Sequence, residues 1–223
     1  HSGHFSALMA SFNDPRFRYC PKANGGLSNA RNFGVDLSKG AWIAFIDQDD
    51  LWDEDKLERQ MTVVRENPEV NLIFTDGRNI GNINRELGVA SKNGLKEGLV
   101  RDTYTRLLKG NFVICSSVLF RKTMQAKAGQ SNPCYRICPD YEYTIRLAEH
   151  TDFYFLRKTL VSYRIHGSNT MKNQLKLAAE EILLLCDRRI VTKKQKLLAT
   201  YNLLRNLVTL ATCWLKKIVA NKA

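Results

Sequence analysis

The sequence predicts an α/β domain with a mixed, mostly parallel sheet flanked by helices, followed by a C-terminal helical extension. Apolar runs at 42–46 and 71–75 lack the alternation of half-exposed strands, which is typical of strands buried on both faces. Between these runs the apolar residues recur at helical spacing, and beyond Gly167 the pattern predicts helices only. A length of 223 residues suits one such domain with an appendage. We therefore expect a main domain at 1–171 and a helical extension at 172–223.

The individual elements follow from apolar spacing and from end signals. Ser28 is the expected N-cap of one helix, and Asp53 caps another that ends at Asn67-Pro68. A loop or short hairpin is expected at 77–100, and a loop at 125–139. The helix capped by Ser28 is expected at 29–38. Further helices are expected at 5–12, 103–109, 140–149, 175–191 and 194–219, and further strands at 112–120 and 153–163.

Charge is unevenly distributed along the chain. The net charge is +12, which favours anionic partners. From Lys172 onward there are eleven Lys or Arg against three acids, whereas residues 47–55 hold six carboxylates in nine positions. Such a cluster repels itself unless a cation, helix N-termini or solvent relieves the repulsion.

Asp47, Asp49 and Asp50 follow a buried strand directly, and ligands of open α/β sheets bind at the carboxyl ends of strands. Carboxylates at such a point suit a hard divalent cation, Mg²⁺ or Mn²⁺, shared with substrate phosphates. The alternative is a solvated helix N-terminus, which accounts well for 53–55 but poorly for Asp47, because that residue continues the apolar strand.

Several sequence blocks resemble the family 2 glycosyltransferases of GT-A fold. The blocks are Asn24-Gly25-Gly26-Leu27-Ser28-Asn29-Ala30-Arg31-Asn32-Phe33-Gly34, Gly40-Ala41-Trp42-Ile43-Ala44-Phe45-Ile46-Asp47-Gln48-Asp49-Asp50, Gly110-Asn111-Phe112, Pro139-Asp140-Tyr141-Glu142, and Tyr163-Arg164-Ile165-His166-Gly167-Ser168-Asn169-Thr170. Residues and spacing both match, over residues 10 to 171.

This resemblance implies inverting, metal-assisted transfer of a sugar from a nucleotide-diphosphate donor, a UDP-sugar first, to an acceptor hydroxyl. Asp47 takes the ribose role, Asp49 the metal role with Asp50 in support, and Asp140 the role of general base. The family's Glu before that base is Pro139 here, which leaves the base in place but changes its positioning. The chemistry needs a base because an alcohol is a poor nucleophile at neutral pH. An N-cap role is the alternative for Asp140.

The remaining site residues are given by the same blocks. The turn at Asn24 and Gly26 joins the donor site, and Arg31 approaches the donor phosphates from the start of its helix. We expect His166 to contact the metal or the diphosphate. The alternatives are a surface arginine and a structural histidine.

Three further expectations concern the extent of the chain, its cellular compartment and its acceptor. Family members begin with two strands that carry much of the base pocket, so we expect His1 to open an N-terminally truncated fragment whose isolated activity is doubtful. Six dispersed cysteines, with a weak zinc pattern at Cys134 and Cys138, indicate reduced thiols in the cytoplasm. The resemblance implies an acceptor that is a carbohydrate or is lipid-linked, in polysaccharide or glycolipid biosynthesis of the cell envelope.

The basic C-terminal segment has two interpretations. Leu197, Tyr201, Leu204, Val208, Ala211 and Leu215 follow helical spacing among lysines and arginines. Such a helix either lies peripherally on the inner face of an anionic membrane or packs back on the domain. We expect no nucleic-acid partner, since no stacking-aromatic pattern accompanies the charge.

Two other classes stay open at this point. A sugar-phosphate nucleotidyltransferase also uses an α/β sheet, acids and Mg²⁺. A non-catalytic module that binds a membrane or a protein would explain the basic segment without any chemistry.

Overall fold

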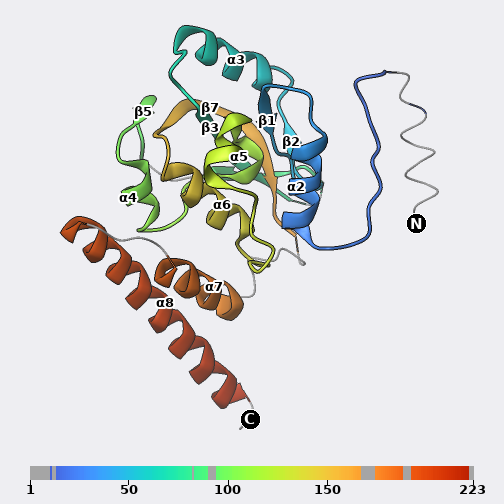
Figure 1. Ribbon diagram of the computed structural model, residues 1–223. Coiled ribbons are helices and arrows are strands. Elements are labelled where there is room, and N and C mark those ends of the chain that lie inside the picture. Colours follow the sequence, from blue (N-terminus) through green and yellow to red (C-terminus); the bar gives the residue numbers. More distant parts are fainter. Residues whose placement is uncertain are drawn as a thin grey trace.

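The structure is a computed structural model that describes residues 11, 14–81, 83–89, 94–166, 174–187 and 192–220. A central sheet lies between helix α3 (Lys56–Glu66) on one face and helices α2 (Leu27–Leu37), α5 (Thr123–Ala128) and α6 (Pro139–Ala148) on the other (Figure 1). The α/β class is confirmed.

The sheet is mixed, and its central pair is parallel. Its strand order is β1 (Trp42–Ala44), β6 (Leu119–Arg121), β3 (Leu72–Ile80), β7 (Phe153–Arg164) and β2 (Leu51–Trp52). Strand β4 (Glu86–Val89) pairs with β3, and β5 (Gly98–Val100) pairs with β7.

Among the described strands, β3 and β7 pair in parallel and the other pairs are antiparallel. The sheet therefore has fewer parallel pairs than we expected, because β6 runs in the opposite direction between β1 and β3. The short strands β2, β4 and β5 add antiparallel edges, and β4 forms the hairpin expected within 77–100.

The helices largely follow their predicted segments. The remaining ones are α4 (Thr103–Leu107), α7 (Gln174–Cys186) and α8 (Lys193–Ala220). Two predictions are wrong in part: α5 occupies the start of the loop expected at 125–139, and the strand expected at 112–120 is reduced to β6 after a 3₁₀ turn at Cys115–Ser117. The helix expected at 5–12 lies outside the described residues except for Ser11.

The two predicted caps are also different. Gly26 holds the N-cap position of α2, and Asp55 that of α3, neither with a side-chain cap bond. Gly26 has a φ of 85°, a conformation that L side chains rarely adopt, so the turn before α2 requires glycine. Asp53 instead forms an ion pair with Arg78, at 2.5 Å.

The hydrophobic core has two parts, one on each face of the sheet. The larger joins the sheet to the helices of the α6 side and includes Phe74, Phe120, Phe155 and Tyr141. It also includes Leu184 of α7 and Ala199 of α8, so both C-terminal helices pack against the domain. The smaller part lies under α3. The domain boundary proposed at residue 171 falls outside the described residues.

Candidate active site

The acidic segment begins just beyond β1, at one edge of the sheet. The amide of Asp50 donates to the carbonyl of Asp47 at 3.0 Å, which closes a tight turn. The Asp47 amide donates to the Ser116 hydroxyl at 3.0 Å. The turn is thereby anchored to the 3₁₀ segment before β6, and its carboxylates emerge at the strand end as predicted.

Asp47 forms an ion pair with Arg31 of α2. Their side chains meet at 2.7 Å, and the Arg31 side chain is only 9% exposed. The guanidinium also lies 5.4 Å from the centre of the Phe45 ring. Burial acts to lower the pKa of Arg31, but acidic groups that include Asp47 and Asp140 outweigh it and raise the pKa. Arg31 is therefore a permanent buried cation, not a surface arginine.

Asp49 faces His166, which follows β7. The His166 Nε2 atom lies 2.7 Å from a carboxylate oxygen of Asp49, and both side chains are partly exposed. The Arg164 side chain donates to the main-chain carbonyl of Asp49 at 2.7 Å. Asp49 and His166 are more than a hundred positions apart in sequence, and the fold brings a carboxylate oxygen of one next to an imidazole nitrogen of the other. Solvent can reach both side chains.

Asp50 is buried and points into the protein. The Ser116 hydroxyl donates to it at 2.6 Å, and the Arg164 amide at 3.0 Å. Burial raises the pKa of Asp50, and these hydrogen bonds oppose that rise. Asp49, Asp50 and His166 do not form a compact three-ligand group within the described part of the chain.

Asp140 lies in the first turn of α6, directly after Pro139. Burial raises the pKa of Asp140 above the usual aspartate value, Arg31 lowers it, and Asp47 raises it further. Arg31 and Asp47 thus both act on the pKa of Asp140, and the three residues form one electrostatic group. A carboxyl with a raised pKa beside a fixed cation is suited to accept a proton near neutral pH.

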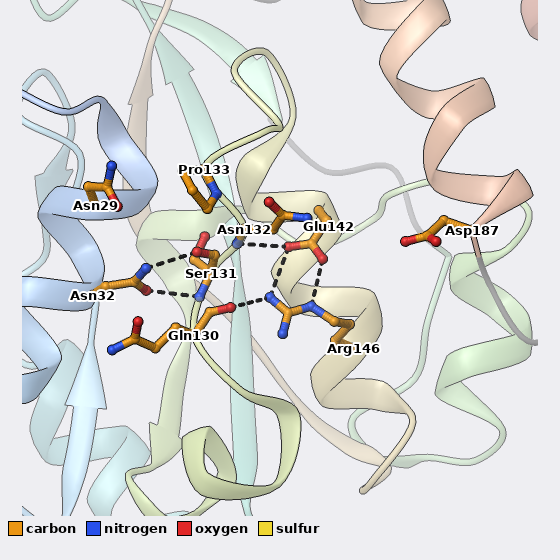
Figure 2. Close-up of a pocket in the computed structure, with 9 residues that line it drawn as sticks. All are labelled: Asn29, Asn32, Gln130, Ser131, Asn132, Pro133, Glu142, Arg146 and Asp187. Carbon is orange, nitrogen blue, oxygen red and sulfur yellow. Dashed lines mark hydrogen bonds and ion pairs between the residues drawn. The ribbon is translucent and has the colours of Figure 1, made fainter.

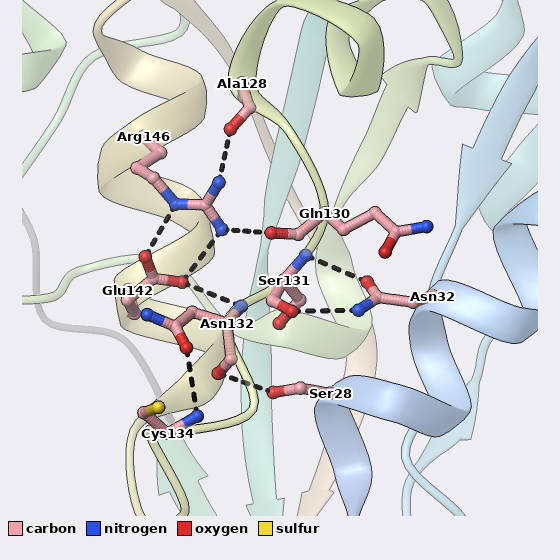
Figure 3. A network of polar contacts seen from close by, with 9 residues as sticks. All are labelled: Ser28, Asn32, Ala128, Gln130, Ser131, Asn132, Cys134, Glu142 and Arg146. Carbon is pink, nitrogen blue, oxygen red and sulfur yellow. Dashed lines mark hydrogen bonds and ion pairs between the residues drawn. The ribbon is translucent and has the colours of Figure 1, made fainter.

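A polar network fixes α2 relative to α6, and so Arg31 relative to Asp140 (Figure 3). The Asn32 side chain exchanges two hydrogen bonds of 2.8 Å with the backbone of Ser131, and the Ser28 hydroxyl donates to the Asn132 carbonyl at 3.1 Å. The predicted Glu142–Arg146 pair is confirmed at 2.6 Å. Ser28 thus serves as a tertiary contact of α2 in place of its expected cap.

The same groups line a pocket of about 440 Å³ between α2 and α6 (Figure 2). Its walls are polar: Asn29, Asn32, Gln130, Ser131, Asn132, Pro133, Glu142, Arg146 and Asp187. Many of these groups form hydrogen bonds or ion pairs with one another, so the residues that line the pocket also hold α2 and α6 together.

A carboxylate of α7, in the C-terminal extension, accepts hydrogen bonds from the backbone of the segment before Asp140. Glu180 of α7 accepts hydrogen bonds from the amides of Arg136, Ile137 and Cys138, at 2.8–3.1 Å. These amides precede α6, and a carboxylate there is favourably placed for the helix dipole. The extension is therefore bonded to the segment that carries Asp140.

Sequence reasoning missed three residues of this site. Ser116 and Glu180 carry no local motif, and tertiary contact alone gives them their roles. Arg164 lies in the same sequence block as His166. Its hydrogen bonds to Asp49 and Asp50 join segments far apart in the chain, so the block alone did not predict them.

The predicted turn at Asn24 and Gly26 lies apart from this group in its described contacts. The Gly26 amide donates to the Asn24 side chain at 3.1 Å, within the turn. Both residues are exposed at the start of α2.

The fold is that of GT-A glycosyltransferases. TarS of S. aureus in complex with UDP-GlcNAc superposes with a TM-score of 0.68 at 11% identity, over 91% of this chain and 59% of that one. A mannosyltransferase from Pyrobaculum calidifontis in complex with GDP-Man and Mn²⁺ gives 0.63 at 13% identity, over 100% and 64%. At these identities the likeness shows the fold alone.

The chain belongs to glycosyl transferase family 2, whose family model matches residues 4–126. It is 26% identical to the chondroitin synthase of Escherichia coli over 169 residues, which is 75% of this chain and 24% of the synthase. The chain spans less than two thirds of the length of the curated relatives it matches, 18% of one and 24% of another. The protein is thus a glycosyltransferase domain by family, as the resemblance implied.

Proposed function

We propose that the whole protein transfers a sugar, with inversion, from a nucleotide-diphosphate donor to an acceptor hydroxyl. The donor is a UDP-sugar, and a divalent cation, Mg²⁺ or Mn²⁺, assists. The observations that support the proposal are two pairs at the end of β1, Asp47 with Arg31 and Asp49 with His166, in a family 2 chain in which Arg31 and Asp47 act on the pKa of Asp140.

Donor binding falls to the residues at the start of α2 and the end of β1. Asp47 accepts from the ribose hydroxyls, and Arg31 neutralises the diphosphate from a position that its ion pair with Asp47 already fixes. The turn at Asn24 and Gly26 brings backbone amides near the start of α2, where an anion is favoured.

The cation would be held by Asp49 and His166. One carboxylate oxygen and one imidazole nitrogen, 2.7 Å apart and partly exposed, suit Mn²⁺ and leave room for diphosphate oxygens. Both oxygens of Asp50 already accept hydrogen bonds, so we assign Asp50 the support of this pair. When bound, the ion offsets the charge that develops on the departing nucleoside diphosphate.

Asp140 takes the proton of the acceptor hydroxyl as the new glycosidic bond forms. Burial raises its pKa, which makes it a stronger base than an exposed aspartate, and Arg31 opposes that rise and so favours the ionised form. The Glu180 bonds to the preceding amides take over the positioning that a Glu at position 139 gives in relatives.

The acceptor is a growing polysaccharide or a lipid-linked saccharide of the cell envelope, and the reaction takes place on the cytoplasmic side. Within the described ranges, none of the helices combines the length and the hydropathy of a membrane-spanning segment. The chondroitin synthase relative supports a polysaccharide acceptor.

Donor binding by the complete protein tests the proposal. Calorimetry with UDP-sugars and GDP-sugars should show an affinity that falls at least tenfold when EDTA replaces Mn²⁺. Asp49→Ala should abolish the metal effect, whereas Asp36→Ala, on the exposed side of α2, should not.

Two outcomes would contradict the proposal. One is the lack of metal-dependent affinity for every nucleotide sugar together with an unchanged Asp49→Ala variant. The other is turnover that releases pyrophosphate in place of a nucleoside diphosphate, which would instead identify a sugar-phosphate nucleotidyltransferase.

A further inference from the structure

Helix α8 presents an apolar stripe to solvent. Leu197, Tyr201, Leu204 and Val208 are spaced by four, three and four residues, so they share one face of the helix. Their exposed fractions are 71%, 53%, 57% and 62%. We call these four residues the outer stripe. Isolated exposed leucines are ordinary, but a continuous helical stripe of large apolar side chains indicates an interaction surface.

The opposite face of α8 is the one that packs on the domain. Ala199, Asn202 and Asn206 are buried there. The Asn202 side chain donates to the Leu108 carbonyl at 3.1 Å, and that of Asn206 to the Glu181 carboxylate at 2.8 Å. These directional bonds fix the rotation of the helix about its axis, so the outer stripe cannot turn inward without breaking them. The helix therefore packs back on the domain through this face, as one of the two sequence interpretations has it, while the outer stripe faces solvent.

The chemistry around the outer stripe is cationic. The 28 residues of α8 include six Lys or Arg and no Asp or Glu. Two of these cations are paired within the protein, Lys194 with Asp102 and Arg205 with Glu181. Lys196 is exposed, next to Leu197, and the Lys109 amine lies 6.0 Å from the centre of the Tyr201 ring. Trp214, 62% exposed, adds a large amphipathic ring farther along the helix. The C-terminal half of α8 projects beyond the rest of the domain (Figure 1), where a broad flat partner can reach it.

We propose that the outer stripe docks on an anionic membrane surface. The apolar side chains enter the boundary between head groups and acyl chains, and Lys196 and Lys109 meet lipid phosphates. Charge complementarity selects this occupant over a second copy of the chain, because two copies of an acid-free helix would bring like charges together. The proposal goes beyond sugar transfer and does not depend on it.

Vesicle sedimentation tests the proposal with the unmodified chain. Binding is expected to vesicles of equal parts phosphatidylcholine and phosphatidylglycerol, to weaken with added salt, and to be at least tenfold weaker for phosphatidylcholine alone. The double variant Leu204→Gln/Val208→Gln should lose at least tenfold in vesicle affinity. Leu183→Gln, an exposed leucine of α7 outside the outer stripe, is the matched control and should bind as the parent does.

The double variant changes exposed side chains, and an unchanged melting temperature will show that it folds. The proposal is overturned if both vesicle types bind the parent equally well, or if the double variant binds as strongly as the parent. It is also overturned if neither vesicle binds and sedimentation velocity finds a dimer that the double variant loses, because the stripe would then face a second copy.

Discussion

At the scale of single residues, Arg31 organises the candidate site. It contacts Asp47 directly, and it acts electrostatically on Asp140, which comes from a different helix. The Arg31 cation lowers the pKa of Asp140 against the effect of burial, which favours the ionised carboxylate that proton acceptance needs. The sequence indicated a phosphate contact for Arg31, and its role between the two acids is visible only in the fold.

Asp140→Asn should lower kcat by about 10²-fold or more, because an amide cannot take the acceptor proton. In the parent, the rate should fall as the pH drops through the pKa of Asp140, and burial places that midpoint above the ordinary aspartate value of about 3.9. Initial rates across pH measure both effects. Glu149→Gln, an exposed acid just past the end of α6, is the control. A kcat unchanged by Asp140→Asn would remove the residue from catalysis.

At the scale of elements, α7 is bonded to the start of α6. Three consecutive backbone amides donate to one carboxylate, Glu180, and would otherwise be left to solvent. Tyr141 of α6 also donates to the Leu107 carbonyl at the end of α4. The extension and the main domain thus share the contacts that set the position of Asp140.

Glu180→Ala should loosen the segment before α6 while leaving the rest of the fold intact. Loss of the carboxylate should lower the free energy of unfolding by about 1–3 kcal/mol. Amides 136–138 should exchange hydrogen faster, and kcat should fall more than the donor KM changes, because donor contacts lie on other elements. Leu183→Ala on the same helix is the control. Equal hydrogen exchange of amides 136–138 in both variants would contradict this positioning role of Glu180.

At the scale of the whole molecule, a buried lysine connects helix α3 with the segment that supports the acidic turn. Lys56 is fully buried, its amine lies 4.1 Å from the centre of the Trp52 ring, and it donates to Gln60 at 2.9 Å. Gln60 in turn donates to the Ser117 carbonyl. Burial lowers the pKa of Lys56 to about 7.

This burial makes the stability of the protein depend on pH. Between about pH 7 and 10 the unfolded chain keeps a proton on Lys56 that the folded chain has lost, so raising the pH favours folding. Relative to Lys56→Met, the parent should gain up to about 1.4 kcal/mol of unfolding free energy per pH unit over this window. Urea unfolding of both proteins across pH measures the difference, and Lys96→Met is the exposed control. Parallel pH curves for parent and Lys56→Met would refute a neutral buried lysine.

Sequence reasoning succeeded where the signal is local, as in the helix carrying Arg31 and the Glu142–Arg146 pair, which depend on residues a few positions apart. The run at 42–46 does form a strand before Asp47, but the expected burial on both faces is wrong: β1 lies at the edge of the sheet, Ile43 alone of the run is buried, and Ile46 is exposed. Sequence reasoning failed where the partner is distant in the chain: the hydroxyl of Ser28 was expected to cap its own helix, yet it bonds to Asn132. The number of parallel strand pairs was overestimated for the same reason, since pairing joins segments that no local pattern relates.

By itself, the amino-acid sequence determined the family, the α/β class and the residue types at the candidate site, because these are written in short motifs and in apolar periodicity. The tertiary structure alone decided that Asp50 points inward while Asp49 meets His166, that Glu180 braces the Asp140 segment, and which face of α8 meets solvent. The physical reason is that side-chain direction, burial and pKa depend on neighbours that folding brings together from far apart in the chain.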